Sequence, residues 1–377
     1  MVSSKTYSYI LSLFLTLIIL LSALFAFISN FLSLGTILSL FFAIFVLCVD
    51  LYKADIRLKK SYEAYFFGIF FLINFAGYLF FYCNISRYIS INSQLLLLTI
   101  VALAFQNDKL ELVSKPLVYS FFFVGILLLV VNFMFPIDYT SNRIISNPNS
   151  VGLCFFLLSY FAYVSTEEKA ARLGIIILVI LLAFLFRART SILSMVSTSI
   201  LIMLSEKHVR FQRKITWLII ICLCLLNLVI ILLYTTENVS SAIIVFRFAG
   251  KGLFTGRQYL WRASLDAISK SPIIGYGSGI SLDSLIQDFR SVHNYYLQII
   301  LQTGFVGLVC FILFIYFSLN KLANMNTNKA RIGYCYIVGI LVASTFEVFL
   351  TQNNFTFSVL TAAIYGTSRS PSSSDIG

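Results

Sequence analysis

Charged residues are scarce in this chain of 377 residues. Asp, Glu, Lys and Arg together make up 11% of the sequence and hydrophobic residues make up 59%, whereas an ordinary soluble domain is roughly one quarter charged. A soluble fold could not cover its surface with so few charges, which excludes a soluble enzyme, a secreted disulfide scaffold and a disordered linker protein. The apolar stretches are continuous and do not alternate with a period of two, so the sequence predicts an all-α polytopic membrane protein.

The residues that usually bind metals and nucleotides are also scarce. The two histidines, His208 and His293, are far apart in the sequence, and the seven cysteines lie within or beside apolar segments. This pattern indicates neither a metal cluster nor a disulfide framework. A P-loop and a dinucleotide-binding glycine motif are absent, which argues against a chain that hydrolyses nucleotide itself. We therefore expect no metal and no other cofactor.

Twelve apolar segments are expected to cross the membrane, because a spanning helix needs about 20 mostly apolar residues. With the N-terminus inside, the inner loops hold most of the 27 Lys and Arg residues. This distribution follows the positive-inside rule and accounts for the net charge of +12 without nucleic acid. Both termini are therefore expected in the cytoplasm. The segments lie near 9–29, 31–51, 64–83, 89–106, 116–135, 151–165, 173–186, 190–205, 215–234, 295–317, 332–350 and 355–366.

The whole chain, 1–377, is expected to form one membrane domain with one large outer loop at 235–294. This loop is the only polar region large enough to fold by itself. Apolar residues at helical spacing predict a helix over Gln258–Ser269, which the following proline ends. A glycine-rich turn then precedes a second short helix at Ser281–Phe289. The tail at 368–377 is expected to be disordered.

Three arginines are expected on the outer side at the membrane boundary, where the topology rule disfavours cations: Arg143, Arg187 and Arg189. An arginine at this depth is costly unless it meets an anion or water, so each is a candidate for function. The planar guanidinium suits phosphate, because it donates bidentate hydrogen bonds and keeps its charge. The alternative for each is contact with lipid headgroups or with acidic loop residues.

Two further groups lie in the outer loop. Thr255-Gly256-Arg257 stands one turn before Trp261, so Arg257 opens a loop helix and Trp261 either stacks on a sugar or packs on the bundle. His293-Asn294 stands where the chain re-enters the membrane; the imidazole either exchanges a proton with substrate or caps the next helix. Glu347 is an acid near the outer end of its expected span, which indicates proton coupling, a buried partner or a polar outer cavity.

These motifs carry a resemblance to a known family. His293-Asn294 is followed after nine residues by Gly304-Phe305-Val306-Gly307, at the junction of the outer loop and the next span. In this arrangement the chain resembles the bacterial O-antigen polymerase and O-antigen ligase superfamily. The Asn147-Pro148-Asn149 turn, Arg189 before a Thr-Ser pair and the run from Gly256 to Gly277 are similar to other features of that superfamily.

The resemblance implies a metal-independent glycosyltransferase of the GT-C type, acting on the outer face of the bacterial cytoplasmic (inner) membrane. Its donor would be a glycan on undecaprenyl pyrophosphate. Arg189 and Arg257 would stabilise the charge that develops on the pyrophosphate as the glycosidic bond breaks, without a metal ion. His293 would activate the acceptor hydroxyl or contact phosphate. The other substrate-binding candidates are Arg143, Arg187, Arg262, Arg290, Asn294 and Trp261.

Three functions stay open. A polymerase joins repeat units into O-antigen or capsular-type polysaccharide, whereas a ligase moves finished chains to a lipid A core. A chain this rich in Phe, Ile and Lys favours the polymerase. A flippase for lipid-linked oligosaccharide also has about twelve spans, but it would keep its cations in a central cavity and would not need the outer loop. The expected partners are a lipid-linked donor and acceptor, membrane lipids and, for a polymerase, a chain-length regulator protein.

Overall fold

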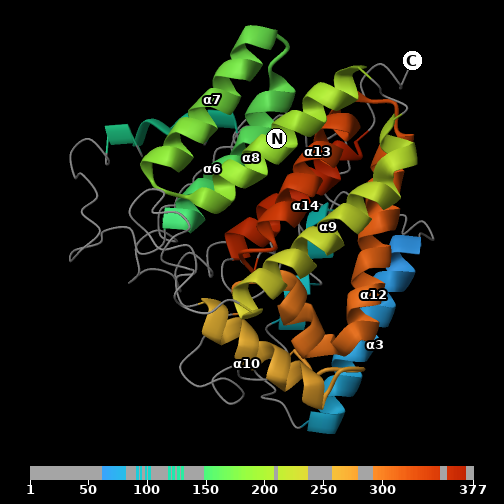
Figure 1. Cartoon of the computed structure of the whole chain (residues 1–377). Helices are drawn as coiled ribbons and strands as arrows, with labels where there is room; N and C mark the ends of the chain where they lie inside the picture. Colours follow the sequence, from blue (N-terminus) through green and yellow to red (C-terminus); the bar gives the residue numbers. More distant parts are fainter. Residues whose placement is uncertain are drawn as a thin grey trace, which may run out of the picture.

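The computed structural model describes residues 62–81, short stretches between 91 and 130, 148–207, 211–236, 257–278, 292–348 and 355–370, and most of these residues are helical (Figure 1). No strand occurs among these residues. The helices are α3 (Tyr62–Phe81), α6 (Pro148–Ser165), α7 (Lys169–Leu185), α8 (Arg189–Lys207), α9 (Phe211–Thr236), α10 (Arg257–Lys270), α12 (Tyr295–Asn324), α13 (Asn328–Ala343) and α14 (Phe355–Ser368).

Two of these helices are long and apolar enough to cross a membrane, Ile215–Thr235 within α9 and Tyr295–Asn324. Shorter apolar helices lie at Gly68–Gly77 and Asn149–Ser165. The expected spans coincide with α3, α6, α7, α8, α9, α12 and α14 to within a few residues at most of their ends. The total of twelve stays a prediction, since the spans at 9–29 and 31–51 lie outside the described residues and those at 89–106 and 116–135 are described only in part.

One predicted span was misplaced. The segment at 332–350 was expected to be a single helix, but α13 begins earlier and ends at Ala343. Thr327 caps its start, because the Thr327 side chain accepts a hydrogen bond from the backbone N–H of Ala330 at 3.2 Å. A turn over 344–346 then ends the helix, so Glu347 lies outside it and in a buried bend.

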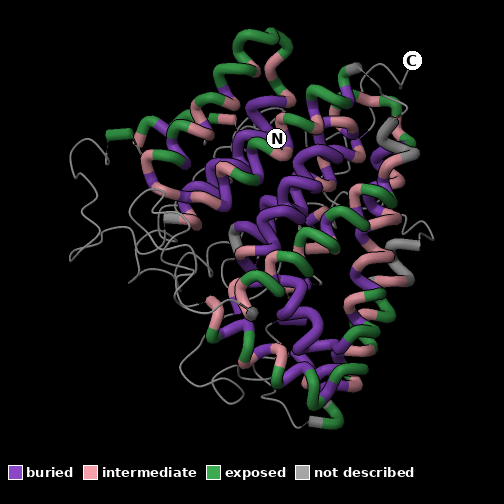
Figure 2. Tube along the Cα trace, viewed as in Figure 1, coloured by how far each residue is buried: buried purple, intermediate pink, exposed green. Residues whose placement is uncertain are grey.

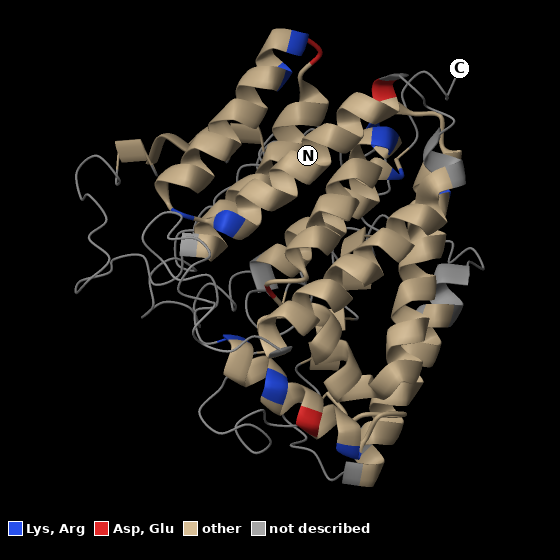
Figure 3. Cartoon of the chain, in the orientation of Figure 1, with Lys and Arg blue, Asp and Glu red and all other residues tan. Residues whose placement is uncertain are grey.

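The helices form a bundle around α13 and α14, with α6 to α8 on one side and α9, α12 and α3 on the other (Figure 1). Burial is highest in the central helices, whereas the outer walls are exposed (Figure 2). Apart from Lys169 at the start of α7, the exposed residues described on α7 and α9 are apolar, among them Leu181 and Phe184 on α7 and Leu225 and Leu232 on α9. The charged residues gather near helix ends and on α10 (Figure 3). Apolar walls with charges at their ends are what a lipid-facing bundle presents.

The loop helix was predicted at Gln258–Ser269 and forms as α10, Arg257–Lys270. It lies across one end of the bundle (Figure 1). Its apolar side packs into a cluster with residues from α9 and α12, among them Trp261, Ile231 and Leu301. The second predicted loop helix, Ser281–Phe289, lies outside the described residues.

The C-terminal tail begins later than the sequence indicates. Ser368, expected to be disordered, is the last residue of α14. It is fully buried, and its hydroxyl group is 2.8 Å from the Tyr160 hydroxyl. Gly333 on α13 permits this approach, because a Cβ atom there would collide with the Ser368 side chain. Residues 371–377 lie outside the described residues.

The glycines of the His-Asn-(nine residues)-Gly-x-x-Gly motif mark a break in α12. Gly304 has φ 64° and ψ −170°, outside the helical region. The loop that follows α10 enters the break and supplies the missing partners: the N–H of Phe305 donates to Pro272 O at 2.8 Å and the N–H of Gly277 donates to Gln302 O at 2.8 Å. A Cβ atom on Gly304 would collide with the carbonyl group of Ile273. Only glycine fits here, and residues of α12 before the break, among them Leu297 and Leu301, pack against α10.

We expect Gly304→Ala to destabilise the protein strongly. The combination of φ 64° and ψ −170° is occupied almost only by glycine and costs another residue roughly 1–3 kcal/mol, and the collision with Ile273 adds to this cost. The measurement is the thermal unfolding temperature of the purified protein in detergent. Gly174→Ala is the matched control, because a Cβ on this residue of α7 meets nothing within 4 Å, so its stability should match or exceed that of the wild type. Equal unfolding temperatures for both variants would contradict the assignment.

Candidate active site

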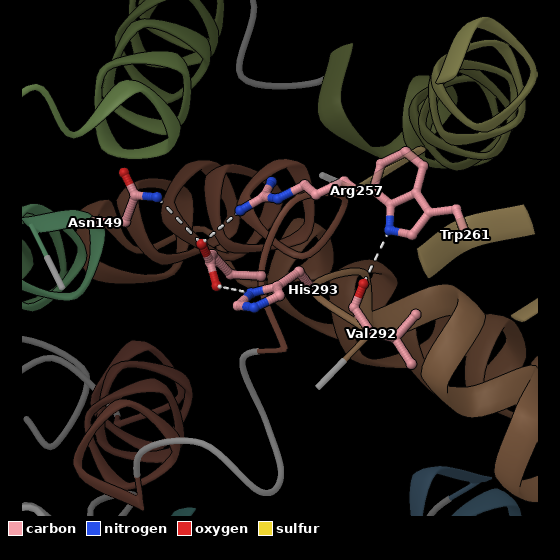
Figure 4. Close-up of polar contacts among 6 residues, drawn as sticks. Asn149, Arg257, Trp261, Val292 and His293 are labelled. Atoms are coloured by element: carbon pink, nitrogen blue, oxygen red, sulfur yellow. Dashed lines mark hydrogen bonds and ion pairs between the residues drawn. The ribbon is translucent and has the colours of Figure 1, made fainter. Parts of the chain in front are cut away.

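Three side chains from three separate segments meet around the carboxylate of a fourth residue, Glu347 (Figure 4). Arg257 Nη2 lies 3.0 Å from Oε1 of Glu347, and the Asn149 side-chain amide donates to the same oxygen at 3.3 Å. The Nδ1–H of His293 donates to the other oxygen, Oε2, at 3.2 Å. The Glu347 side chain is 9% exposed and that of His293 is 38% exposed. The arrangement joins a buried anion to a partly exposed imidazole.

The surroundings keep Glu347 ionised. Burial by itself would raise the pKa of this carboxyl group. The hydrogen bond from His293, the charge of Arg257 and the hydrogen bond from Asn149 outweigh burial and hold the pKa below its ordinary value. An ionised Glu347 only accepts hydrogen bonds, so Nδ1 of His293 carries the proton of this bond and Nε2 lies on the opposite edge of the ring.

The backbone holds His293 in a rarely occupied conformation, with φ 52°. Its neighbours fix it on both sides: Trp261 donates to Val292 O at 2.9 Å, and the side chain of Asn294 accepts from the N–H of Leu297 at 3.0 Å as the N-cap of α12. Asn294 also donates to Asn227 on α9 at 2.9 Å. Strained conformations of this kind persist where the surrounding structure determines them, and they cluster at functional sites.

Two expected substrate contacts have a structural role in this site. Asn294 is fully buried and makes the cap and the contact with α9 described above. Trp261 has no exposed surface, and its ring packs against Tyr234 at a centroid distance of 4.6 Å. In the structure Trp261 therefore packs on the bundle and does not lie open to a sugar. The ring belongs to the apolar side of α10, which faces the bundle. Trp261 anchors α10 one turn after Arg257.

Arg187 and Arg189 lie in the turn between α7 and α8. Arg187 has φ 52°, and among the described residues only it and His293 have a positive φ without being glycine. Gly152 on α6 lets this turn pack closely, since a Cβ there would come within 2.5 Å of Ala188 Cβ. Arg189 is the first residue of α8, so this one turn carries two of the predicted arginines.

The remaining arginines differ in their placement. Arg262 is exposed on α10, and its Nε–H donates to the Thr235 carbonyl at 2.7 Å. This bond fastens α10 to the end of α9. Arg143 and Arg290 lie outside the described residues, so their expected roles stay predictions. In the described part of the chain, no three His, Cys, Asp or Glu side chains are grouped closely enough to hold a metal ion.

Glu347 and Asn149 were not among the predicted site residues. The sequence did show Glu347 as an acid in an apolar segment, and a buried partner was one of the three explanations considered for it. That partner is the pair Arg257 and His293. The Asn147-Pro148-Asn149 turn was also noted, but its role in orienting Glu347 follows only from the contact across 198 residues.

Comparison with known proteins points to the family that the motif indicated. Residues 153–312 match the family model described as O-antigen ligase. A Rickettsia conorii protein that carries the provisional name polysaccharide ligase is 27% identical over 124 residues, which covers 28% of this chain and 30% of that protein. The matched part is thus less than one third of the relative. The two matches confirm the resemblance to the O-antigen ligase and polymerase superfamily.

Proposed function

We propose, from the match of residues 153–312 to the O-antigen ligase family model, that this protein is a membrane glycosyltransferase that polymerises oligosaccharide repeat units. Its substrates are units carried on undecaprenyl pyrophosphate at the outer face of the bacterial inner membrane. Twelve spans, cytoplasmic termini and a GT-C fold are part of the proposal. The observation that carries it is the group formed by His293, Glu347 and Arg257, which combines a base and a cation without a metal ligand set.

The transfer step uses each of these groups once. The acceptor hydroxyl oxygen attacks the anomeric carbon of the donor, and its proton passes to Nε2 of His293. The bond between the anomeric carbon and the pyrophosphate oxygen breaks, and its electron pair leaves with the lipid pyrophosphate. Arg257 and Arg189 stabilise the negative charge on this leaving group. Glu347 stabilises the imidazolium that forms and holds the ring in its working orientation.

A ligase is the second candidate, because both the matching family and the Rickettsia relative carry that description. The same site would serve it, since only the acceptor differs: a repeat unit on the lipid carrier for a polymerase and a lipid A core for a ligase. The donor chemistry is identical in both cases.

The test is a reaction in nanodiscs with an authentic lipid-pyrophosphate repeat unit and no added metal or nucleotide, with products resolved by size. We expect a ladder of repeat-unit multiples. Transfer only after a lipid A core acceptor is added would assign the ligase instead. Movement of the intact lipid-linked unit across a sealed vesicle membrane, with no new glycosidic bond in either reaction, would assign a flippase and overturn the proposal.

A further inference from the structure

The loop over residues 271–277, which follows α10, is hydrogen-bonded to the middle of a membrane-spanning helix. The N–H of Val306 on α12 donates to Ile273 O at 3.3 Å. In the opposite direction, the N–H of Tyr276 donates to Leu301 O at 2.8 Å. These bonds hold the loop at the break in α12, nine residues after the helix begins, and therefore well inside the length of the span.

A second helix places the loop at the same depth. Gly77 of α3 packs on the loop so closely that a Cβ atom there would come within 2.8 Å of the Gly277 Cα atom. α3 continues beyond this contact to Phe81, which is roughly 6 Å along the helix axis. Leu79 and Phe80, in this last part, are exposed apolar residues. The apolar wall of α3 thus extends past the loop.

The tip of the loop is apolar and continues the exposed surface of α12. The Ile273 side chain is 66% exposed. Phe305, Val306 and Val309, which follow the break in α12, are exposed as well and belong to the helix that is long enough to cross a membrane. A surface that continues a lipid-facing wall is covered by lipid. Because most of the Ile273 side chain is exposed, it projects from the protein, which favours bulk acyl chains over a single bound polyprenyl chain.

The backbone of the loop is suited to membrane depth, where irregular backbone is tolerated only if its polar groups are bonded. Pro272 has no N–H, and its carbonyl accepts from the N–H of Phe305 at 2.8 Å. The Ser271 hydroxyl donates to Gly275 O at 2.9 Å. Lys270, at the end of α10, is exposed. A lysine next to an apolar tip suits the level of the lipid phosphates, because its stem lies along apolar surface while its ammonium group stays in the polar layer.

We propose that the loop over residues 271–277 is inserted in the membrane, with the Ile273 side chain among the lipid acyl chains of the leaflet next to α10. The partner is bulk lipid, and the inference does not depend on which group the active site transfers. Insertion ties the last turn of α10 to the membrane. The helix that begins with Arg257 is thereby held along the membrane surface.

The experiment uses tryptophan fluorescence, because the chain has only two tryptophans. Trp261 has no exposed surface and Trp217 is exposed on α9, so Trp217→Phe leaves one tryptophan shielded from lipid. Ile273→Trp is added to this full-length background, and Ser269→Trp, at an exposed position of α10, is the matched control. Each protein is placed in nanodiscs of phosphatidylcholine brominated near the glycerol end or near the terminal methyl end of its acyl chains.

We expect the tryptophan at position 273 to lose most of its fluorescence in the lipid brominated near the glycerol end and less in the other lipid. The tryptophan at position 269 should keep its fluorescence in both. Unfolding temperatures establish that the variants are folded. Pro272 is also exposed, so Pro272→Trp tests the same depth if Ile273→Trp does not fold.

Three results would overturn the proposal. Undiminished fluorescence at position 273 would place the loop in water. Equal quenching at positions 269 and 273 would place the whole exposed side of α10 in lipid, with no special role for the loop. Protection of position 273 by added unbrominated undecaprenyl phosphate would assign the tip to a polyprenyl chain and not to bulk lipid.

Discussion

Replacing Arg257 by lysine is expected to reduce kcat for glycosyl transfer by roughly 10²- to 10³-fold while the protein keeps nearly its wild-type unfolding temperature. Losing one donor that is aimed at developing charge has an effect of this size. Lysine retains the positive charge beside Glu347, so the buried carboxylate keeps its counter-ion. It lacks the planar fork that binds two oxygens of a pyrophosphate at once. Single-turnover rates with a lipid-pyrophosphate donor measure the effect on chemistry.

Arg172→Lys is the matched control for this substitution. Arg172 lies on α7, away from α10, where its Nε–H donates to Thr166 O at 2.6 Å and its guanidinium group lies over the Tyr163 ring. Its replacement should leave kcat unchanged. Wild-type kcat in Arg257→Lys would show that Arg257 serves only as the counter-ion of Glu347.

Arg257→Ala should lose both activity and stability, because Glu347 then remains buried without its cation. Breaking one side of a buried ion pair costs about 3–5 kcal/mol, and the two side chains here are 15% and 9% exposed. The double variant Arg257→Ala/Glu347→Gln removes the uncompensated charge as well. It should therefore recover part of the stability and none of the activity. This separates the contribution of Arg257 to folding from its contribution to catalysis.

The helices could be predicted from the sequence because hydropathy is a local property. Most apolar runs became helices with nearly the expected bounds, and Gln258–Ser269 became α10. The exception is instructive. The run at 332–350 is apolar over most of its length, but its last part turns because Glu347 must reach partners on α10 and before α12. A tertiary requirement there overrides the local pattern.

The site could be predicted only in part, because its contacts join residues that are far apart in the sequence. His293 and Arg257 could be predicted as site residues, because histidine is rare in this chain and an arginine is unusual at a membrane boundary. Their common partner Glu347 could not be predicted, because it is 54 residues from His293 and 90 residues from Arg257 in the sequence. The role of Trp261 was open, because a helical period gives the side of a helix but not what covers it. The strained φ of Arg187 and of His293 has no local signature, because neither residue is a glycine.

Glu347→Gln is expected to reduce kcat by on the order of 10²- to 10⁴-fold, the range for loss of a carboxylate that orients a catalytic histidine. Glutamine has nearly the same shape, but it carries no charge to stabilise the imidazolium or to fix the proton on Nδ1. KM should change much less than kcat, because Glu347 reaches the substrate only through His293 and Arg257. Glu206→Gln is the matched control, since Glu206 is exposed near the end of α8.

The pH dependence of stability distinguishes the ionised carboxylate from a merely well-packed side chain. The pKa of Glu347 lies below its ordinary value of 4.5 in the folded protein, so the unfolded chain takes up the proton first as the pH falls. The stabilisation is therefore complete above pH 4.5 and is lost as the pH falls through the lower, folded-state pKa. The difference in unfolding temperature between wild type and Glu347→Gln should be constant near neutral pH and shrink below about pH 4.5. A difference that persists unchanged in acid would mean that packing, rather than charge, ties Glu347 to Arg257 and His293.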